Sequence, residues 1–240
     1  MDTLEERIDE YTSYFRVVLE NIANMAASEE RAAPVFRTIL YFSCLDAWAG
    51  DAFPQYGNKE RFVEFIHRIT EWEHADRVSI PQLLHCRSKL RTENELCLRM
   101  LSKIYDYNFS IEDISSEAHI EMPKARVISD DPRIGDLISE IDVASKACVE
   151  PFQFSYLLWD YRNFVVHRFQ FPGRATDVLS KKKDVPYYLP CGNALELILP
   201  VACLQKLCQH SLAKFDIWLK KREIDPLCDS ELKTCWKRGG

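Results

Sequence analysis

The sequence of 240 residues predicts an all-α fold: an antiparallel bundle of long helices with additional shorter ones. Three observations lead to this prediction. Apolar residues recur at steps of three and four along several segments, which is the helical period. Segments in which apolar and polar residues alternate, as in a half-buried strand, are nearly absent. Glycine occurs seven times, which is few for a turn-rich β protein.

The first two helices have clear start signals. Thr3 and Glu6 have the spacing of a capping box, and the apolar residues that follow share one helical face: Leu4, Ile8, Tyr11, Phe15, Val18, Ile22 and Met25. Pro34 suits the start of a second helix, because a proline in the first turn loses no hydrogen bond. That segment is apolar on nearly all sides, which predicts a central, buried helix.

Further start signals follow in the first half of the chain. They lie at Asn58, at Ser79 with Pro81, at the capping box of Thr92 with Glu95 and, for a short turn, at Ser110 with Asp113. The helical pattern fades between about residues 115 and 129, where we expect a loop or a short strand.

The second half is expected to hold three more helices. Asp131 and Pro132 start a helix that continues through Ala144, and Pro151 precedes a helix that Pro172 and Gly173 end. Residues 171–190 lack a helical period and contain three prolines, so they predict a long surface loop. Residues 193–222 are expected to form one long closing helix, bent at Pro200, and residues 225–240 a short tail.

Charge is unevenly distributed along the chain. The net charge of −6 argues against non-specific binding of nucleic acid by the whole protein. Residues 162–183 nevertheless carry six basic residues and one acid, Asp177. This segment is either a solvated loop or a site for an anion. As an RNA-binding segment it would use Arg168, Arg174, Lys181, Lys182 and Lys183.

Nine cysteines occur without a CxxC pair. The amino terminus is acidic where a secretion signal would be basic, and no apolar run approaches 18 residues. We therefore expect a cytoplasmic protein with reduced thiols and no membrane partner. The nearest approach to a metal-binding cluster is Cys203, Cys208 and His210, but the paired ligands of a zinc site are missing. The cysteines are therefore interpreted as small buried hydrophobic residues, with no metal or other cofactor.

The stretch "YRNFVVHR" offers the chemistry for a catalytic site. Asn163 and His167 are four residues apart and share a helical face, whereas Arg162 lies about 140° away from His167 around the helix. An imidazole can move a proton near neutral pH, a guanidinium can bind a phosphate, and an amide can orient either. These groups suffice to cleave RNA without a metal. In the structural alternative, His167 is a hydrogen-bonded core residue and Arg162 pairs with Asp160 or with an acid distant in the sequence.

This motif resembles that of the HEPN superfamily, whose members carry Arg-x4-6-His, often as Arg-Asn-x-x-x-His, near the end of a bundle helix. The residues that match this motif are Arg162, Asn163 and His167. The resemblance covers chiefly residues 132–222, and it implies that residues 1–240 form a single HEPN-like domain. It implies a metal-independent endoribonuclease whose site forms across a homodimer, of the kind found in toxin–antitoxin and phage-defence systems, with an antitoxin or regulatory protein as a partner. Other members are non-catalytic modules that bind RNA or protein, and an unrelated helical protein is a further alternative.

The same Arg–His spacing occurs twice more, at Arg61 with His67 and at Arg68 with His74. We interpret both as chance matches, since neither has an asparagine after the arginine. Glu64, Glu71 and Glu73 lie nearby, so this segment is either a carboxylate–histidine metal site or, by our interpretation, a solvated face. Tyr187 and Tyr188 in the predicted loop either stack on bases or pack against the bundle.

Overall fold

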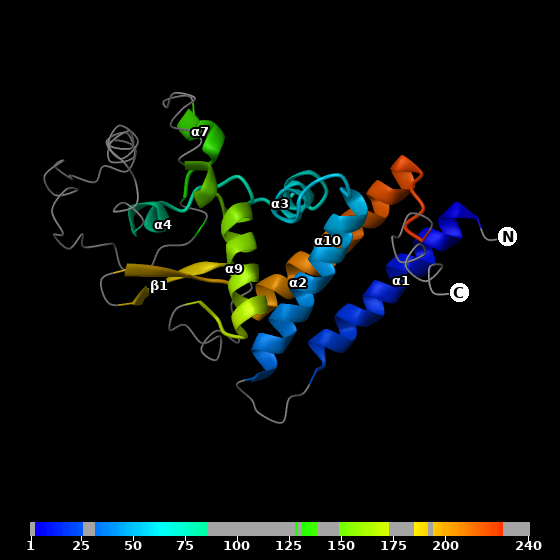
Figure 1. Ribbon diagram of the computed structural model, residues 1–240, viewed down its shortest axis with the longest axis horizontal. Coiled ribbons are helices and arrows are strands. Elements are labelled where there is room, and N and C mark those ends of the chain that lie inside the picture. Colours follow the sequence, from blue (N-terminus) through cyan, green and yellow to red (C-terminus); the bar gives the residue numbers. More distant parts are fainter. Residues whose placement is uncertain are drawn as a thin grey trace, which may run out of the picture.

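The protein is described by a computed structural model over residues 3–25, 32–85, 128, 131–138, 149–172, 185–191 and 194–227. In chain order its elements are α1 (Leu4–Ala23), α2 (Ala32–Ala52), α3 (Asn58–Arg68), α4 (Ile80–His85), α7 (Ile134–Ile138), a 3-10 turn (Glu150–Phe152), α9 (Phe154–Arg168), β1 (Tyr187–Cys191), β2 (Ala194–Ile198) and α10 (Val201–Arg222). The predominance of helices confirms the predicted class, with one small hairpin added (Figure 1).

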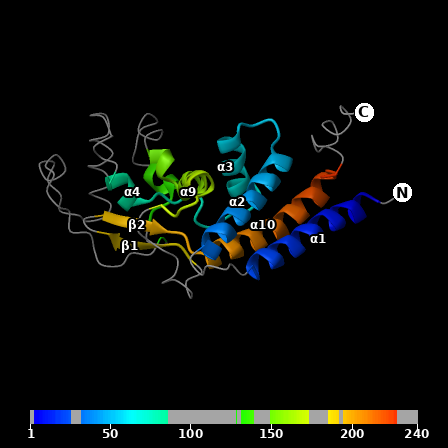
Figure 2. The same ribbon diagram turned by 60° about the horizontal axis from the view of Figure 1, so that its bottom comes forward.

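Three long helices form the bundle. Figures 1 and 2 show α1, α2 and α10 side by side, with α1 running opposite to the other two. Helices α3 and α9 pack on α2. The largest fully buried side chains of this core are aromatic and come mainly from α2, α3 and α10: Trp48, Tyr41, Phe42, Phe62, Phe65 and Phe215. Burial of such rings is the main source of stability for a bundle.

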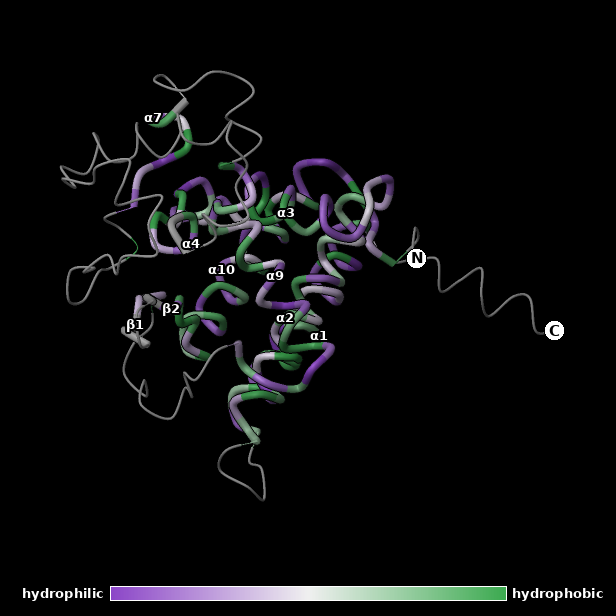
Figure 3. The backbone as a smooth tube through the Cα atoms, turned by 60° about the vertical axis from the view of Figure 1, so that its left-hand side comes forward, coloured by the Kyte–Doolittle hydropathy of each residue, from purple (hydrophilic) through white to green (hydrophobic). Residues whose placement is uncertain are grey.

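The two amino-terminal helices form as predicted. The Thr3 hydroxyl accepts a hydrogen bond from the Glu6 N–H at 3.2 Å, and the Glu6 carboxylate accepts one from the Thr3 N–H at 2.6 Å, which completes the capping box. Hydrophobic and hydrophilic residues succeed one another along the coils of α1 in Figure 3, since only one face is buried. The predicted central position of α2 is confirmed by its contacts with α1, α3, α9 and α10, although one of its sides, at Phe36, Ser43 and Ala47, is exposed.

The predicted closing helix is wrong in its first part. Residues 194–198 form β2, which pairs antiparallel with β1 so that Tyr187 faces Ile198 and Cys191 faces Ala194. Residues 187–190 therefore belong to a strand and not to a long loop. Pro200 explains the correction: it disfavours helical backbone at the preceding residue, so it caps α10 at its start and does not bend it.

The hairpin is attached to the rest of the fold through Tyr188. Its ring is buried with Ile128 and Phe154, and its hydroxyl donates a hydrogen bond to the Asp131 carboxylate. The same hydroxyl shares a hydrogen bond of 2.7 Å with Ser79, the residue before α4. This buried network fixes β1 against the start of α4 and excludes Tyr188 from an exposed stacking role.

Several predicted elements lie outside the described residues. They are the helix at Thr92, the turn at Ser110, all but Ile128 of the segment at 115–129, and the tail beyond residue 227. The helix predicted from Asp131 begins at Ile134 and is described to Ile138. Among the described helices, none has the combination of length and apolar character that crossing a lipid bilayer requires.

Candidate functional site

Helix α9 carries the motif in its last two turns. Leu158, Tyr161 and Val165 are buried in the core of the bundle and fix the face that this helix turns to it, whereas Phe154 at its start packs on Tyr188 of the hairpin. The helix ends at Arg168, earlier than the predicted stop at Pro172, because Phe169 adopts a left-handed conformation with φ 54°. The N–H of Phe169 donates to the Val165 carbonyl at 2.9 Å, which closes the last turn.

Arg162 is held by an aspartate of the central helix. Its Nε lies 2.7 Å and its Nη2 2.5 Å from Oδ2 of Asp46 in α2, and the two side chains are 19% and 21% exposed. Its Nη1 donates to the Asn163 side-chain oxygen at 2.8 Å, and its guanidinium lies 4.9 Å from the centre of the Trp159 ring. The guanidinium thus has one defined position at the junction of α9 and α2.

Asp46 belongs to a row of alternating charges that consists of Arg162, Asp46, Arg61 and Asp51. Burial raises the pKa of the Asp46 carboxyl, while Arg162 and, more weakly, Arg61 of α3 lower it. The Arg61 guanidinium lies over Gly50, where a Cβ would be 3.7 Å from its central carbon. Asp51 follows and accepts a hydrogen bond from the Tyr11 hydroxyl of α1. Charged side chains thus connect α9, α2 and α3, and the hydrogen bond from Tyr11 adds α1 at the exposed end.

His167 stands apart from this arrangement. It is exposed in the last turn of α9 and makes no hydrogen bond or ion pair with the described residues. The structure therefore joins Arg162 to Asn163 but joins His167 to neither within one chain. The structural alternative of a core histidine does not hold for His167, whereas Arg162 does pair with an acid, Asp46 and not Asp160.

One of the predicted RNA-binding residues is described. Arg168 is exposed, and its guanidinium lies 4.9 Å from the centre of the Phe164 ring. Arg174, Lys181, Lys182 and Lys183 lie outside the described residues.

In the two other Arg–His matches, the histidine side chains are turned towards the interior of the protein. Nε2 of His67 lies 2.8 Å from the Ser155 hydroxyl of α9, and His74 is buried beside Glu73. Burial lowers the pKa of both histidines. The prediction of a solvated face is thus wrong for these imidazoles, although the carboxylates of Glu71 and Glu73 are exposed. His67 and His74 belong to the packing of the bundle.

The side chains of Cys44, Cys203 and Cys208 are buried, as expected of small hydrophobic residues. Burial raises the pKa of Cys44 to about 11 and also raises that of Cys208, so neither is a reactive thiolate at neutral pH. Of the others, Cys191 lies in β1, and Cys86, Cys97, Cys148, Cys228 and Cys235 lie outside the described residues. In the part of the chain that is described, no three potential metal ligands come together.

Sequence reasoning missed Asp46. It lies 116 residues before Arg162, so no local spacing could link the two. The available signal was its isolation within the apolar segment of residues 32–49, because a charge in such a helix needs a partner elsewhere in the fold. Sequence reasoning also missed a cleft between α9, α4 and β2, since the hairpin that forms one wall was not foreseen.

Comparison with known proteins provides no relative. The chain matches no protein-family model, no curated protein and no solved structure. Any function therefore has to be argued from the residues of this chain and from the resemblance of its motif.

We expect the Arg162–Asp46 pair to be coupled in stability. Arg162→Ala should lower the free energy of unfolding by about 1–3 kcal/mol, because it leaves a half-buried carboxylate without its partner. Asp46→Ala should have a similar cost, and the double variant should cost clearly less than the sum of the two. Urea unfolding measures all three. Arg168→Ala is the control and should change stability by less than about 0.5 kcal/mol; strictly additive costs would contradict a direct pair.

We expect His74 to make the free energy of unfolding depend on pH. Because burial lowers its pKa from 6.5, the unfolded chain takes up this proton at a higher pH than the folded protein. The contribution of His74 is therefore lost as the pH falls below about 6.5, through the folded pKa. His74→Gln should make the free energy of unfolding less sensitive to pH between about 7 and 5. Comparison with wild type cancels Asp46 and Asp51, whose raised pKa values act in the opposite direction. Identical pH profiles would refute the prediction.

Proposed function

We propose that the protein is a metal-independent endoribonuclease of HEPN type, with Arg162, Asn163 and His167 as its site. The observation that carries the proposal is an exposed imidazole, which bonds none of the described residues, on the same two helical turns as an arginine whose position is fixed. An arginine held by a carboxylate and an amide needs no reordering when it meets a phosphate, and such preorganisation is the main source of electrostatic catalysis.

Arg162 retains capacity for a phosphate. A guanidinium has five N–H donors. The bonds to Asp46 and Asn163 use one on each of its three nitrogens, which leaves two directed elsewhere. The side chain is 19% exposed, so a ligand has access to it. A phosphate that receives both remaining N–H groups is bound in the geometry that favours arginine over lysine.

The reaction supported by these groups is attack of a ribose 2′-oxygen on the adjacent phosphorus. The 2′-hydroxyl gives up its proton to a base, the P–O5′ bond breaks, and the leaving 5′-oxygen takes a proton from an acid. The products are a 2′,3′-cyclic phosphate and a 5′-hydroxyl. His167 serves as one of the two proton-transfer groups, and Arg162 stabilises the charge that develops on phosphorus.

A second chain completes the site in this proposal. Each chain supplies one His167, whereas the reaction uses a base and an acid. Arg162 and His167 also lie about 140° apart on α9, so they do not face a single phosphate from one chain. In a two-fold dimer the partner subunit's His167 and Arg162 provide the missing groups, since both are repeated by symmetry.

The Asp46 contact favours a second candidate, a non-catalytic HEPN-like module that binds RNA or protein. The carboxylate cancels the charge of Arg162, which weakens its attraction for a phosphate. In that case the pair serves to attach α9 to α2, and His167 is a surface residue. A role as toxin or phage-defence effector, held in check by an antitoxin or regulatory protein, belongs to the enzyme candidate and rests on the resemblance alone.

Cleavage of RNA in the presence of chelator tests the enzyme candidate. Wild-type protein in EDTA should produce fragments ending in 2′,3′-cyclic phosphate, and His167→Ala should reduce the rate by about 10²- to 10⁴-fold. Arg162→Lys should be similarly damaged, because an ammonium lacks the bidentate fork. Asn163→Ala should cost less. Fragment ends are identified by mass spectrometry.

His210→Ala is the matched control, because His210 is also exposed but lies on α10 and bonds the Thr70 carbonyl. It should retain wild-type cleavage. Activity that stops in EDTA, or that survives intact in His167→Ala, would contradict the enzyme candidate. RNA that is bound but never cut would favour the module.

The proposal requires a homodimer. Light scattering at micromolar concentration should give about twice the mass of one chain, and the mass should fall together with activity on dilution. A monomer with full ribonuclease activity would refute the composite site while leaving the chemistry in place.

A further inference from the structure

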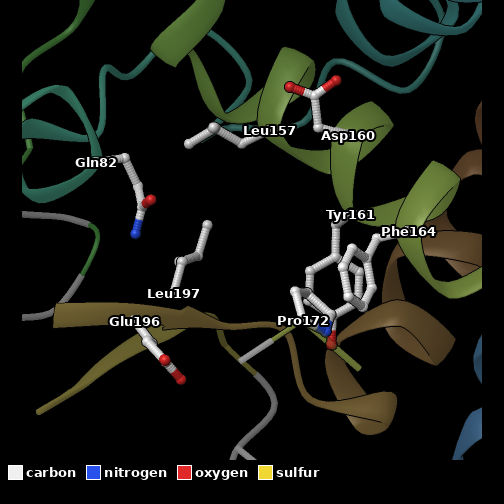
Figure 4. A pocket seen from close by; sticks show the side chains of 8 residues that line it. All are labelled: Gln82, Leu157, Asp160, Tyr161, Phe164, Pro172, Glu196 and Leu197. Carbon is white, nitrogen blue, oxygen red and sulfur yellow. The ribbon is translucent and has the colours of Figure 1, made fainter. Parts of the chain in front are cut away.

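A cleft of about 300 Å³ lies beside the motif, between α9, α4 and β2. Leu157, Tyr161 and Phe164 of α9 form one wall, Gln82 of α4 and Leu197 of β2 lie opposite, and Pro172 closes one end. Two acidic residues, Asp160 and Glu196, also line the cleft, and Figure 4 shows their carboxylates turned away from its centre. Figure 4 shows Gln82 and Leu197 directed into the space below α9, with Tyr161, Phe164 and Pro172 gathered at one side. The volume is at the small end for ligand sites, so the cleft suits a single compact group.

The walls of this cleft suit a flat, uncharged ring. Aromatic and aliphatic side chains provide two opposed surfaces, and the Gln82 side chain places an amide at the edge of the cleft. Nucleobases bind to proteins in this way, by stacking on aromatic side chains with polar groups at the ring edge. Arg168 lies over Phe164 and extends the stack towards solvent with a positive charge.

The cleft is continuous with the proposed catalytic residues. Phe164 precedes His167 by three positions and Arg168 by four, so both neighbour it one turn along α9. Side chains at these spacings are about 5–6 Å apart at Cβ. A nucleotide whose base occupies the cleft therefore has its phosphate beside Arg168 and His167.

We propose that this cleft binds the base of the nucleotide next to the scissile phosphate in single-stranded RNA, with Phe164 as the stacking residue and Arg168 at the phosphate. The inference deepens the proposed ribonuclease function and rests on it for the identity of the substrate. It also supplies what Arg162 and His167 lack, a surface that sets the position of the RNA chain.

The test compares two probes that differ only in the base: adenosine 5′-monophosphate and ribose 5-phosphate. Titrations of the 240-residue chain, followed by amide NMR shifts, give both dissociation constants. In wild type the base should tighten binding by roughly 5- to 150-fold. Phe164→Ala should remove most of this difference and leave the affinity for ribose 5-phosphate unchanged. Phe164→Trp should preserve it.

Tyr14→Ala is the matched control, because Tyr14 is an aromatic residue, 64% exposed, on α1. It should bind both probes as wild type does. If Phe164→Ala does not fold, as judged by circular dichroism, Phe164→Leu keeps the apolar volume without the planar ring and should lose the same difference. Equal affinity of wild type for the two probes overturns the proposal, and so does an unchanged preference in the Phe164 variants.

Neither probe contains a bond that the enzyme would cut, so the result is independent of catalysis. If the base preference depends on Phe164 but RNA survives in EDTA, the cleft is a base-binding site and the ribonuclease proposal fails. If RNA is cut but the base preference is absent, the cleft proposal fails and the ribonuclease stands.

Discussion

The contact between Asp46 and Arg162 is the constraint on which the arrangement of the site depends. It joins α2, which contacts four other helices, to the helix that carries the motif. Placing a carboxylate in an apolar helix is unfavourable unless a cation meets it, and Arg162 is that cation. With Arg162 directed to α2, the remaining faces of α9 have fixed directions. Leu158 and Val165 enter the core, and His167 faces solvent.

A second consequence concerns how charge is used in this fold. The row of Arg162, Asp46, Arg61 and Asp51 places opposite charges in alternation across α9, α2 and α3, and the Tyr11 hydroxyl of α1 bonds the last of them. Pairs of this kind add modestly to stability, because the cost of removing charges from water offsets their attraction. They do discriminate strongly between arrangements, since sliding one helix by a turn would leave a buried charge unpaired. The row therefore contributes more to the correct alignment of the helices than to the stability of the fold.

Local patterns in the sequence were sufficient for the long helices and failed where distant residues decide the structure. The capping box at Thr3 and the all-round apolar character of α2 are properties of contiguous residues, and both predictions were correct. The hairpin depends on pairing between residues 187–191 and 194–198 and on the bond from Tyr188 to Asp131, which no local period reveals. The same holds at the site: the motif was visible in one stretch, but its partner Asp46 was not. The inward direction of His67 and His74 likewise follows from packing against other elements.

The left-handed residue at the end of α9 ties together two parts of the molecule. Phe169 takes a backbone conformation that costs a residue with a side chain roughly 1–2 kcal/mol relative to glycine. It reverses the chain so that Phe171 lies against Tyr161 and Pro172 reaches the cleft. Exposed connections usually accept changes in length, but residues 169–172 have a fixed span to cover. Insertion or loss of a single residue there would move a wall of the cleft while leaving every described helix intact, so the shape of the cleft depends more on the length of this turn than on its composition.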